Sequence, residues 1–288
     1  MSVMKILVVG LQTHDAGKTT LCKALIHGFK KFDVDLVPFK PHSGISYWNQ
    51  FNTFQEGLAR RALLSSDIME LEEAAHSKLP LELLNPVNRL SSPTLHREAT
   101  EERLAFREFV AERFTYHDGS SCRSIYYLNG TINTNHMRGM KDLFLAIKSN
   151  AEKVIFIRNF QQLVKAYVDN FEKATGSCYR SLHENPLIVE SFNDAAYPFS
   201  RTEDCNIVLC ASSNMILRFN EREYFKAIEL RGQQKPKAQQ ITTDVYYSAL
   251  VERRYELQPL TNDERRDPAR LTANYSEIID DLIDGLKK

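Results

Sequence analysis

The opening of the chain constrains its fold more than any other segment. A run of apolar residues, Ile6–Val9, leads directly into Gly10-Leu11-Gln12-Thr13-His14-Asp15-Ala16-Gly17-Lys18-Thr19-Thr20. A buried strand that ends in such a loop, with a helix from about Lys18, aims backbone amides and the positive helix end at one point. We therefore predict a phosphate-binding loop, in which Lys18 reaches the β- and γ-phosphates and Thr19 offers its hydroxyl to Mg²⁺.

This loop is longer than the standard phosphate-binding motif. The glycine expected five residues before Gly17 is replaced by Gln12, and the available glycine, Gly10, lies two residues earlier. A chance Gly-Lys-Thr at a helix start is the alternative. The apolar strand before the loop and the helical spacing of apolar residues after it favour nucleotide binding. The predicted nucleotide contacts are Thr13, His14, Asp15, Ala16, Gly17, Lys18, Thr19 and Thr20.

Composition narrows the class of protein. The 288 residues are 43% hydrophobic, and 37 basic residues balance 37 acidic ones, which argues against a protein that wraps nucleic acid. No apolar segment is long enough to span a bilayer, and the opening run is too short for a signal peptide. We therefore expect no membrane association and a cytoplasmic location. The five cysteines contain no CxxC pair, which argues against a zinc site or a disulfide framework.

Apolar runs alternate with helical patterns along the chain. Besides Ile6–Val9, the predicted strands are Val34–Phe39, Ser124–Leu128, Val154–Ile157, Leu187–Val189 and Asn206–Cys210. The predicted helices are Thr20–Lys31, Glu101–Phe114, Met140–Asn150, Phe160–Ala174 and Glu221–Leu230. This alternation predicts an α/β fold with a doubly wound, mostly parallel sheet flanked by helices, the three-layer, Rossmann-like build of P-loop NTPases.

The chain also has a natural division near a polar stretch at residues 233–237. We predict an α/β domain over residues 1–232 and a C-terminal helical appendage over residues 233–288. The appendage either covers a face of the core or binds a partner, because its composition is charged and loop-like.

Polar residues follow the predicted strands. In open α/β sheets, ligands bind beyond the carboxyl ends of the strands. We therefore expect one rim, shared with the phosphate-binding loop, to carry Lys40, Asn129, Arg158, Asn159 and Glu190.

Several short motifs occur in a characteristic order over about residues 4 to 220. They are the loop from Gln12 to Thr19, Phe39-Lys40-Pro41-His42-Ser43-Gly44, Ser66-Asp67, Asn85-Pro86-Val87 with Pro93 and His96, and Val189-Glu190. This order resembles that of dethiobiotin synthetase and its relatives among the P-loop ATPases. The resemblance implies that Lys40 contacts a carboxylated substrate and the transferred phosphate, that Asp67 and Glu190 hold Mg²⁺ with Thr19, and that the protein forms a homodimer.

The chain also departs from that family. The glycine-rich stretch expected after the acidic strand end is Ser191–Ala196 here, and a strand–helix unit over about Arg123–Arg180 is inserted. No Asn-x-x-x-Pro nucleobase motif follows the later strand. These departures favour an ATPase or ligase of the same build that acts on another substrate.

Each candidate residue also has a structural alternative. Asp67 is suited to cap the helix that follows it, and Glu190 to form a structural salt bridge. Lys40 could be a surface lysine, although Pro41 favours an extended backbone that directs its side chain to the rim. Asp15, which we count with Lys18 and Lys40 as a catalytic candidate, orients a substrate amine or water, or bonds loop amides.

Two further features each have a functional and a structural interpretation. The 42–50 segment carries the only tryptophan, Trp48, among polar groups, so it is either a substrate-recognition loop or a loop that Trp48 anchors to the core. His14 and His96 have the pKa range of a general base, but lone histidines are more often structural.

Together these patterns predict an ATP- and Mg²⁺-dependent enzyme that phosphorylates or activates a small polar molecule, such as a carboxylate or carbamate. The alternative is a nucleotide-driven switch or assembly ATPase that acts on a protein partner. A polynucleotide kinase is a third class, which the neutral charge disfavours. The sequence names neither the substrate nor the base of the nucleotide, and the absence of a guanine-reading Asn-Lys-x-Asp motif is mild evidence for ATP over GTP.

Overall fold

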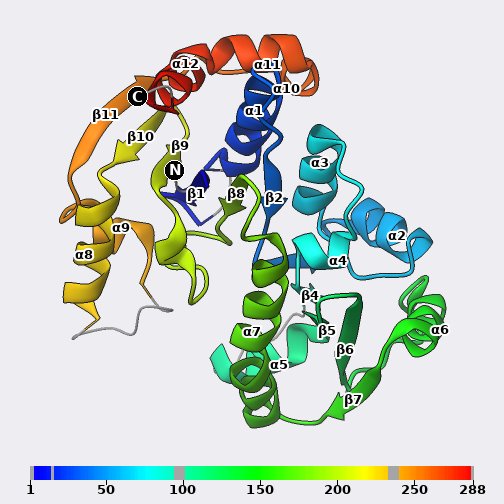
Figure 1. The fold of residues 1–288 in the computed structure, drawn as a ribbon. Coiled ribbons are helices and arrows are strands. Elements are labelled where there is room, and N and C mark those ends of the chain that lie inside the picture. The colour runs from blue at the N-terminus through cyan, green and yellow to red at the C-terminus, as the bar shows by residue number, and fades with distance from the viewer. Residues whose placement is uncertain (1–2, 14–15, 94–100, 233–239, 287–288) are drawn as a thin grey trace. The chain divides into compact units, whose positions relative to one another are not determined.

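Two β-sheets, each with its own helices, are formed by the residues that the computed structural model describes, which are 3–13, 16–93, 101–232 and 240–286 (Figure 1). The first unit comprises Met1–Pro41, Glu70–Lys78 and Leu182–Lys288. The second comprises His42–Met69 and Leu79–Ser181. Within the described part of the chain, no helix combines the length and apolarity needed to cross a membrane.

The first unit contains a six-stranded sheet in the order β11-β10-β9-β1-β8-β2. Its strands are β1 (Lys5–Gly10), β2 (Val37–Phe39), β8 (Leu187–Glu190), β9 (Ile207–Ser212), β10 (Met215–Phe219) and β11 (Val251–Glu256). Its helices are α1 (Lys18–Lys30), the 3₁₀ turn η1 (Thr202–Asp204), α8 (Glu221–Arg231), α9 (Thr242–Tyr246), α10 (Asn262–Arg266), α11 (Pro268–Asn274) and α12 (Ser276–Leu286). The helix α3 (Ser66–Ala75) has residues in both units.

The central part of this sheet is parallel. β1 pairs with β8 on one side and β9 on the other, and β2 pairs with β8 at the edge, all in parallel. Ile6–Val9 is fully buried, as a strand covered on both faces must be. Pro38 is tolerated in β2 because an edge strand can lack one ladder donor.

The C-terminal residues complete the first unit. β11 extends the sheet by antiparallel pairing with β10, and α11 and α12 pack against α1. Asp281 of α12 accepts hydrogen bonds from Tyr255 of β11 at 2.5 Å and Arg218 of β10 at 2.9 Å, and it also pairs with Arg253. This network fixes α12 to the two antiparallel strands.

The second unit contains a five-stranded sheet in the order β3-β4-β5-β6-β7. Its strands are β3 (His42–Ser46), β4 (Val87–Ser91), β5 (Phe109–His117), β6 (Cys122–Asn129) and β7 (Lys153–Ile157). Its helices are α2 (Phe51–Ala59), α4 (Leu81–Leu84), α5 (Glu101–Glu108), α6 (Met140–Asn150) and α7 (Phe160–Leu182). The pairs β3–β4 and β6–β7 are parallel, whereas β4–β5 and β5–β6 are antiparallel.

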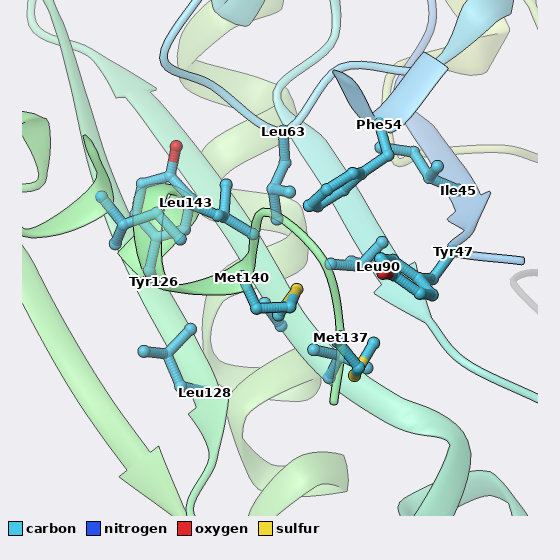
Figure 2. Packing of buried hydrophobic residues seen from close by; sticks show 13 residues of the cluster. Ile45, Tyr47, Phe54, Leu63, Leu90, Tyr126, Leu128, Met137, Met140 and Leu143 are labelled. Carbon is cyan, nitrogen blue, oxygen red and sulfur yellow. The ribbon is translucent and has the colours of Figure 1, made fainter. Parts of the chain in front are cut away.

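A hydrophobic core lies between this sheet and the helices α2 and α6. Figure 2 shows Tyr126 and Leu128 of β6 together with Met140 and Leu143 of α6. Phe54 of α2 belongs to the same cluster. All five side chains are buried. The second unit therefore has a core of its own.

The fold is α/β, as expected, but the arrangement of its strands corrects the prediction. The runs at 124–128 and 154–157 were expected in one mostly parallel sheet with β1. They instead form β6 and β7 of a separate mixed sheet. Continuous apolar runs indicate burial on both faces, but they do not indicate which sheet a strand joins.

One predicted helix is also partly wrong. The segment Glu101–Phe114 is helical only to Glu108, and Phe109–His117 is the strand β5. Glu112 and Arg113 resemble the polar face of a helix in sequence, but both are fully buried in a central strand. Arg113 is satisfied there by the carbonyls of Leu63 and Asn85.

The grouping into units differs from the expected division at residue 232. Residues 182–288 lie with the first 41 residues, and the insertion predicted over 123–180 belongs to the second unit. The expected appendage is also not purely helical, because it contributes the strand β11. The stretch at 233–237 lies outside the described residues.

Candidate functional site

The segment between β1 and α1 is held by its neighbours. The amide of Leu11 donates to the carbonyl of Ala211 at the end of β9 at 3.0 Å. The Gln12 side-chain carbonyl accepts a hydrogen bond from the Ser213 hydroxyl at 3.0 Å. The predicted contacts His14 and Asp15, like His96, lie outside the described residues.

Gly17 ends this segment as the N-cap of α1, with a φ of 85° that favours glycine. It supplies no side-chain cap, and the first turn of α1 contains no acidic residue. The first amides of a helix lack partners within the helix, and the helix dipole is positive there. The start of α1 is therefore suited to an anion.

Lys18 lies across the start of the same segment. A Cβ placed on Gly10 would lie 3.0 Å from Lys18 Nζ and 3.2 Å from Lys18 Cδ, so glycine leaves the room that the lysine needs. Lys18 is a buried residue, and its ammonium donates to the carbonyl of Asn193 at 2.6 Å. The lysine is thus directed toward the residues that follow β8.

Glu190 contacts two other candidate residues, Lys40 and Thr19. It ends β8, where it is paired in register with Val8 of β1. Its Oε1 atom accepts hydrogen bonds from Lys40 Nζ at 2.6 Å and from Thr19 Oγ1 at 3.0 Å. Lys40 and Glu190 are 3% and 1% exposed, so Lys40 is not a surface lysine. The carboxyl ends of β2 and β8 therefore bring together three of the predicted site residues.

The side-chain oxygen atoms of Thr19 and Glu190 suit a Mg²⁺ site in which a bound phosphate supplies further ligands. Mg²⁺ prefers oxygen ligands and is usually held by one or two carboxylates, waters and substrate phosphates. The Thr19 hydroxyl and the Glu190 carboxylate both offer oxygen atoms, and the hydroxyl donates to Glu190 Oε1 at 3.0 Å. No group of three or more His, Cys, Asp or Glu side chains suited to a metal ion occurs in the described part of the chain.

Asp67 lies in the second unit, on the first turn of α3. It is not the N-cap of that helix, because α3 begins at Ser66 and the hydroxyl of Ser65 accepts from the amide of Ile68. Its predicted role as a metal ligand stays a prediction.

The remaining predicted rim residues are not in the sheet that contains β1. Asn129 is the last residue of β6 and donates to the carbonyls of Phe106 and Phe109. Asn159 follows β7, where its side chain accepts from the amide of Gln162 at the start of α7. Arg158, beside it, likewise follows a strand of the second sheet. Their placement in the second sheet corrects the prediction of a single rim.

Contrary to expectation, the 42–50 segment is not a loop throughout. Residues 42–46 form β3, and Tyr47 rather than Trp48 is the anchor, because Tyr47 is 3% exposed and Trp48 is 60% exposed. The rings of Tyr47 and Phe54 lie 5.2 Å apart in an edge-to-face arrangement. The idea that Trp48 fixes this segment to the core is therefore wrong.

One residue near the segment that contacts Lys18 was not indicated by any pattern in the sequence. Thr242, the first residue of α9, donates from its amide and its hydroxyl to the carbonyl of Asp194, at 2.7 Å and 3.0 Å. Asp194 also accepts from the hydroxyl of Thr13, at 3.4 Å. Thr242 thus reaches the segment that contacts Lys18.

Comparison of the chain with protein-family models, with curated proteins and with solved structures finds no match.

Proposed function

We propose that this chain is an ATP- and Mg²⁺-dependent enzyme with a P-loop NTPase core, which phosphorylates a small carboxylate or carbamate. One observation carries the proposal. The adjacent residues Lys18 and Thr19 converge with Lys40 and Glu190, which come from two other parts of the sequence, where β1, β2 and β8 end. Ligands of parallel α/β sheets bind at such carboxyl ends.

Each group has a role that phosphoryl transfer requires. The amides at the start of α1 and the Lys18 ammonium would neutralise the β- and γ-phosphates. Thr19 and Glu190 would hold Mg²⁺, which supplies further charge neutralisation when it is bound. Catalysis of this reaction rests on positioning and electrostatic stabilisation, with little covalent chemistry from the protein.

Lys40 supports the choice of an anionic acceptor. Its ammonium is buried, and Glu190 neutralises it in the structure. If Glu190 turns to Mg²⁺, the charge of Lys40 becomes available to a carboxylate oxygen. That oxygen attacks the γ-phosphorus, ADP leaves, and an acyl phosphate or carbamoyl-type mixed anhydride forms.

The test is ATP turnover with a panel of small mono- and dicarboxylates in the presence of hydroxylamine. Hydroxylamine converts an acyl phosphate to a hydroxamate and releases phosphate. We expect at least one acid to stimulate ADP release and to yield hydroxamate, and Lys18→Ala to abolish both. Basal hydrolysis that no acid stimulates, without hydroxamate, would contradict the enzyme assignment.

A second candidate is a nucleotide-driven switch that acts on a protein partner, and the contact between Lys18 and Asn193 favours it. That contact joins the phosphate-binding lysine to a segment held by the C-terminal part of the chain. Light scattering with and without ATP and Mg²⁺ separates the two candidates. An enzyme, proposed to be a homodimer, keeps one oligomeric state, whereas a switch of the assembly type changes its state with nucleotide.

A further inference from the structure

The six residues that follow β8, Ser191–Ala196, are attached to the protein at both ends. At the first end, the amide of Ser191 donates to the carbonyl of Val8, at 2.9 Å. At the other end, the carbonyl of Ala196 accepts from the hydroxyl of Tyr224, at 2.9 Å. Between these points Asn193 has a φ of 45°, in the left-handed region. We refer to residues 191–196 as the post-β8 segment.

Lys18 holds the middle of the post-β8 segment. Its ammonium donates to the carbonyl of Asn193 at 2.6 Å, which is a short, charge-assisted hydrogen bond. An asparagine tolerates the left-handed region better than most residues, but such a conformation persists only where its surroundings enforce it. The Lys18 contact is one of the interactions that enforce it here.

A strip of the C-terminal region, Gln240–Thr242, holds the same segment from the other side. Asp194 accepts two hydrogen bonds from Thr242, and the amide of Ala196 donates to the carbonyl of Gln240, at 3.0 Å. Ala195 and Ile241 form an antiparallel bridge. Gln240 and Thr242 are 1% and 0% exposed. These residues therefore form a continuous connection from Lys18 to the start of α9.

We propose that the post-β8 segment is a nucleotide-sensitive latch between the phosphate-binding lysine and the Gln240–Thr242 strip. The inference rests on the function proposed above. A triphosphate at the start of α1 competes with the Asn193 carbonyl for the Lys18 ammonium. When Lys18 turns to the phosphate, Asn193 loses its partner, and the hydrogen bonds between Asp194 and Thr242 weaken.

Because the two binding equilibria are linked, the latch can be tested either by adding nucleotide or by weakening the contact with Thr242. If nucleotide binding weakens the contact with Thr242, then weakening that contact strengthens nucleotide binding by the same factor. A ligand shifts such an equilibrium only by its differential affinity for the two states. A loss of one hydrogen bond of ordinary strength, from Thr242→Val, therefore predicts about three- to tenfold tighter ATP binding.

The first experiment needs no nucleotide. Amide hydrogen exchange is measured at Thr242 and Ala196 in the full chain and in Lys18→Met, which removes the ammonium and keeps the side-chain length. We expect faster exchange at both amides in Lys18→Met. Lys23→Met is the matched control on the same helix, because Lys23 pairs with the exposed Glu70 instead. Unchanged exchange in Lys18→Met overturns the latch, whether or not ATP binds.

The second experiment adds nucleotide. ATP with Mg²⁺ should accelerate exchange at Thr242 and Ala196 in the wild type, and Thr242→Val should bind ATP more tightly. Thr272→Val is the control, because Thr272 is a buried threonine whose hydroxyl bonds within α11. ATP that binds without accelerating exchange, with equal affinity for both threonine variants, overturns the latch. A wild type that binds no ATP overturns the proposed function, while the Lys18→Met result still decides the coupling.

Discussion

Lys40 Nζ and Glu190 Oε1 lie 2.6 Å apart, and both side chains are buried. The two residues come from strands that pair in parallel, because β2 lies beside β8 in the first sheet. Each residue directly follows or ends its strand, so the register of the sheet brings the two charges together. A buried ion pair of this kind is costly to break by removal of one member.

Measurements of the unfolding free energy test the ion pair between Lys40 and Glu190. Lys40→Met leaves the Glu190 carboxylate buried without its ammonium and should lower the unfolding free energy by about 3–5 kcal/mol. Adding Glu190→Gln should recover most of the loss, because the amide needs no counter-charge. Lys23→Met, which breaks a partly exposed pair with Glu70, should cost less than about 1 kcal/mol in the same urea titrations. Equal losses in the two single lysine variants would argue against a buried pair.

The metal role of Glu190 has its own test. If Glu190 and Thr19 hold Mg²⁺, then Glu190→Gln should raise the Mg²⁺ concentration needed for half-maximal ATP turnover by at least about tenfold. ATP binding measured without Mg²⁺ should change little. A Mg²⁺ titration that superimposes on that of the wild type would remove Glu190 from the metal site.

Substitution of Lys40 should affect ATP binding and ATP turnover differently. Lys40→Ala should keep ATP affinity close to that of the wild type, because Lys18 and the helix amides are the groups proposed to contact the phosphates. In the proposed reaction the Lys40 ammonium faces charge that develops in the transition state, so turnover should fall by roughly a hundredfold or more. The two quantities are measured by calorimetry and by ADP release, at a temperature where the variant is folded. Normal turnover in Lys40→Ala would exclude Lys40 from the site.

The attachment of α12 predicts a pH dependence of stability. Burial opposes ionisation of Asp281, but hydrogen bonds from Tyr255 and Arg218 and the nearby charge of Arg253 hold its pKa below the ordinary value of 3.8. A carboxyl whose pKa is lowered by folding stabilises the protein above its unfolded pKa, and this stabilisation is lost as the pH falls. Asp281→Asn should therefore cost about 1–3 kcal/mol at pH 7.

The difference between the wild type and Asp281→Asn should shrink as the pH falls below about 4. Asp280→Asn, at the exposed neighbouring position, should have little effect at either pH. Chemical unfolding at several pH values measures both variants. A constant difference across the acidic range would show that the charge of Asp281 does not hold α12.

The sequence predicted the local features of the first unit well. A continuous apolar run, a glycine before Lys18 and helical spacing after it are short-range patterns, and they correspond to β1 and α1. In the second unit, the predicted helix Met140–Asn150 is confirmed at both ends as α6. Glu190 was identified as a strand-end residue from its position alone, and the structure places it beside Lys40 and Thr19.

The rest depended on contacts between distant parts of the chain. The second sheet was missed because buried strands such as β5 do not alternate, so its polar residues resembled a helix face. The contact of Thr242 with Asp194 joins residues 48 positions apart, and no local pattern marks it. As the only tryptophan, Trp48 is the residue that the sequence suggests as an anchor, whereas the structure places its neighbour Tyr47 in the core.

Calorimetric titration with ATP and Mg²⁺ tests most directly whether the start of α1 and Lys18 bind a nucleoside triphosphate. We predict a saturable heat in the wild type that Lys23→Ala retains. Lys18→Ala should weaken the affinity by about a hundredfold, the loss expected for a charge-assisted contact to phosphate. No heat in the wild type, or equal affinity in the two lysine variants, would contradict the account.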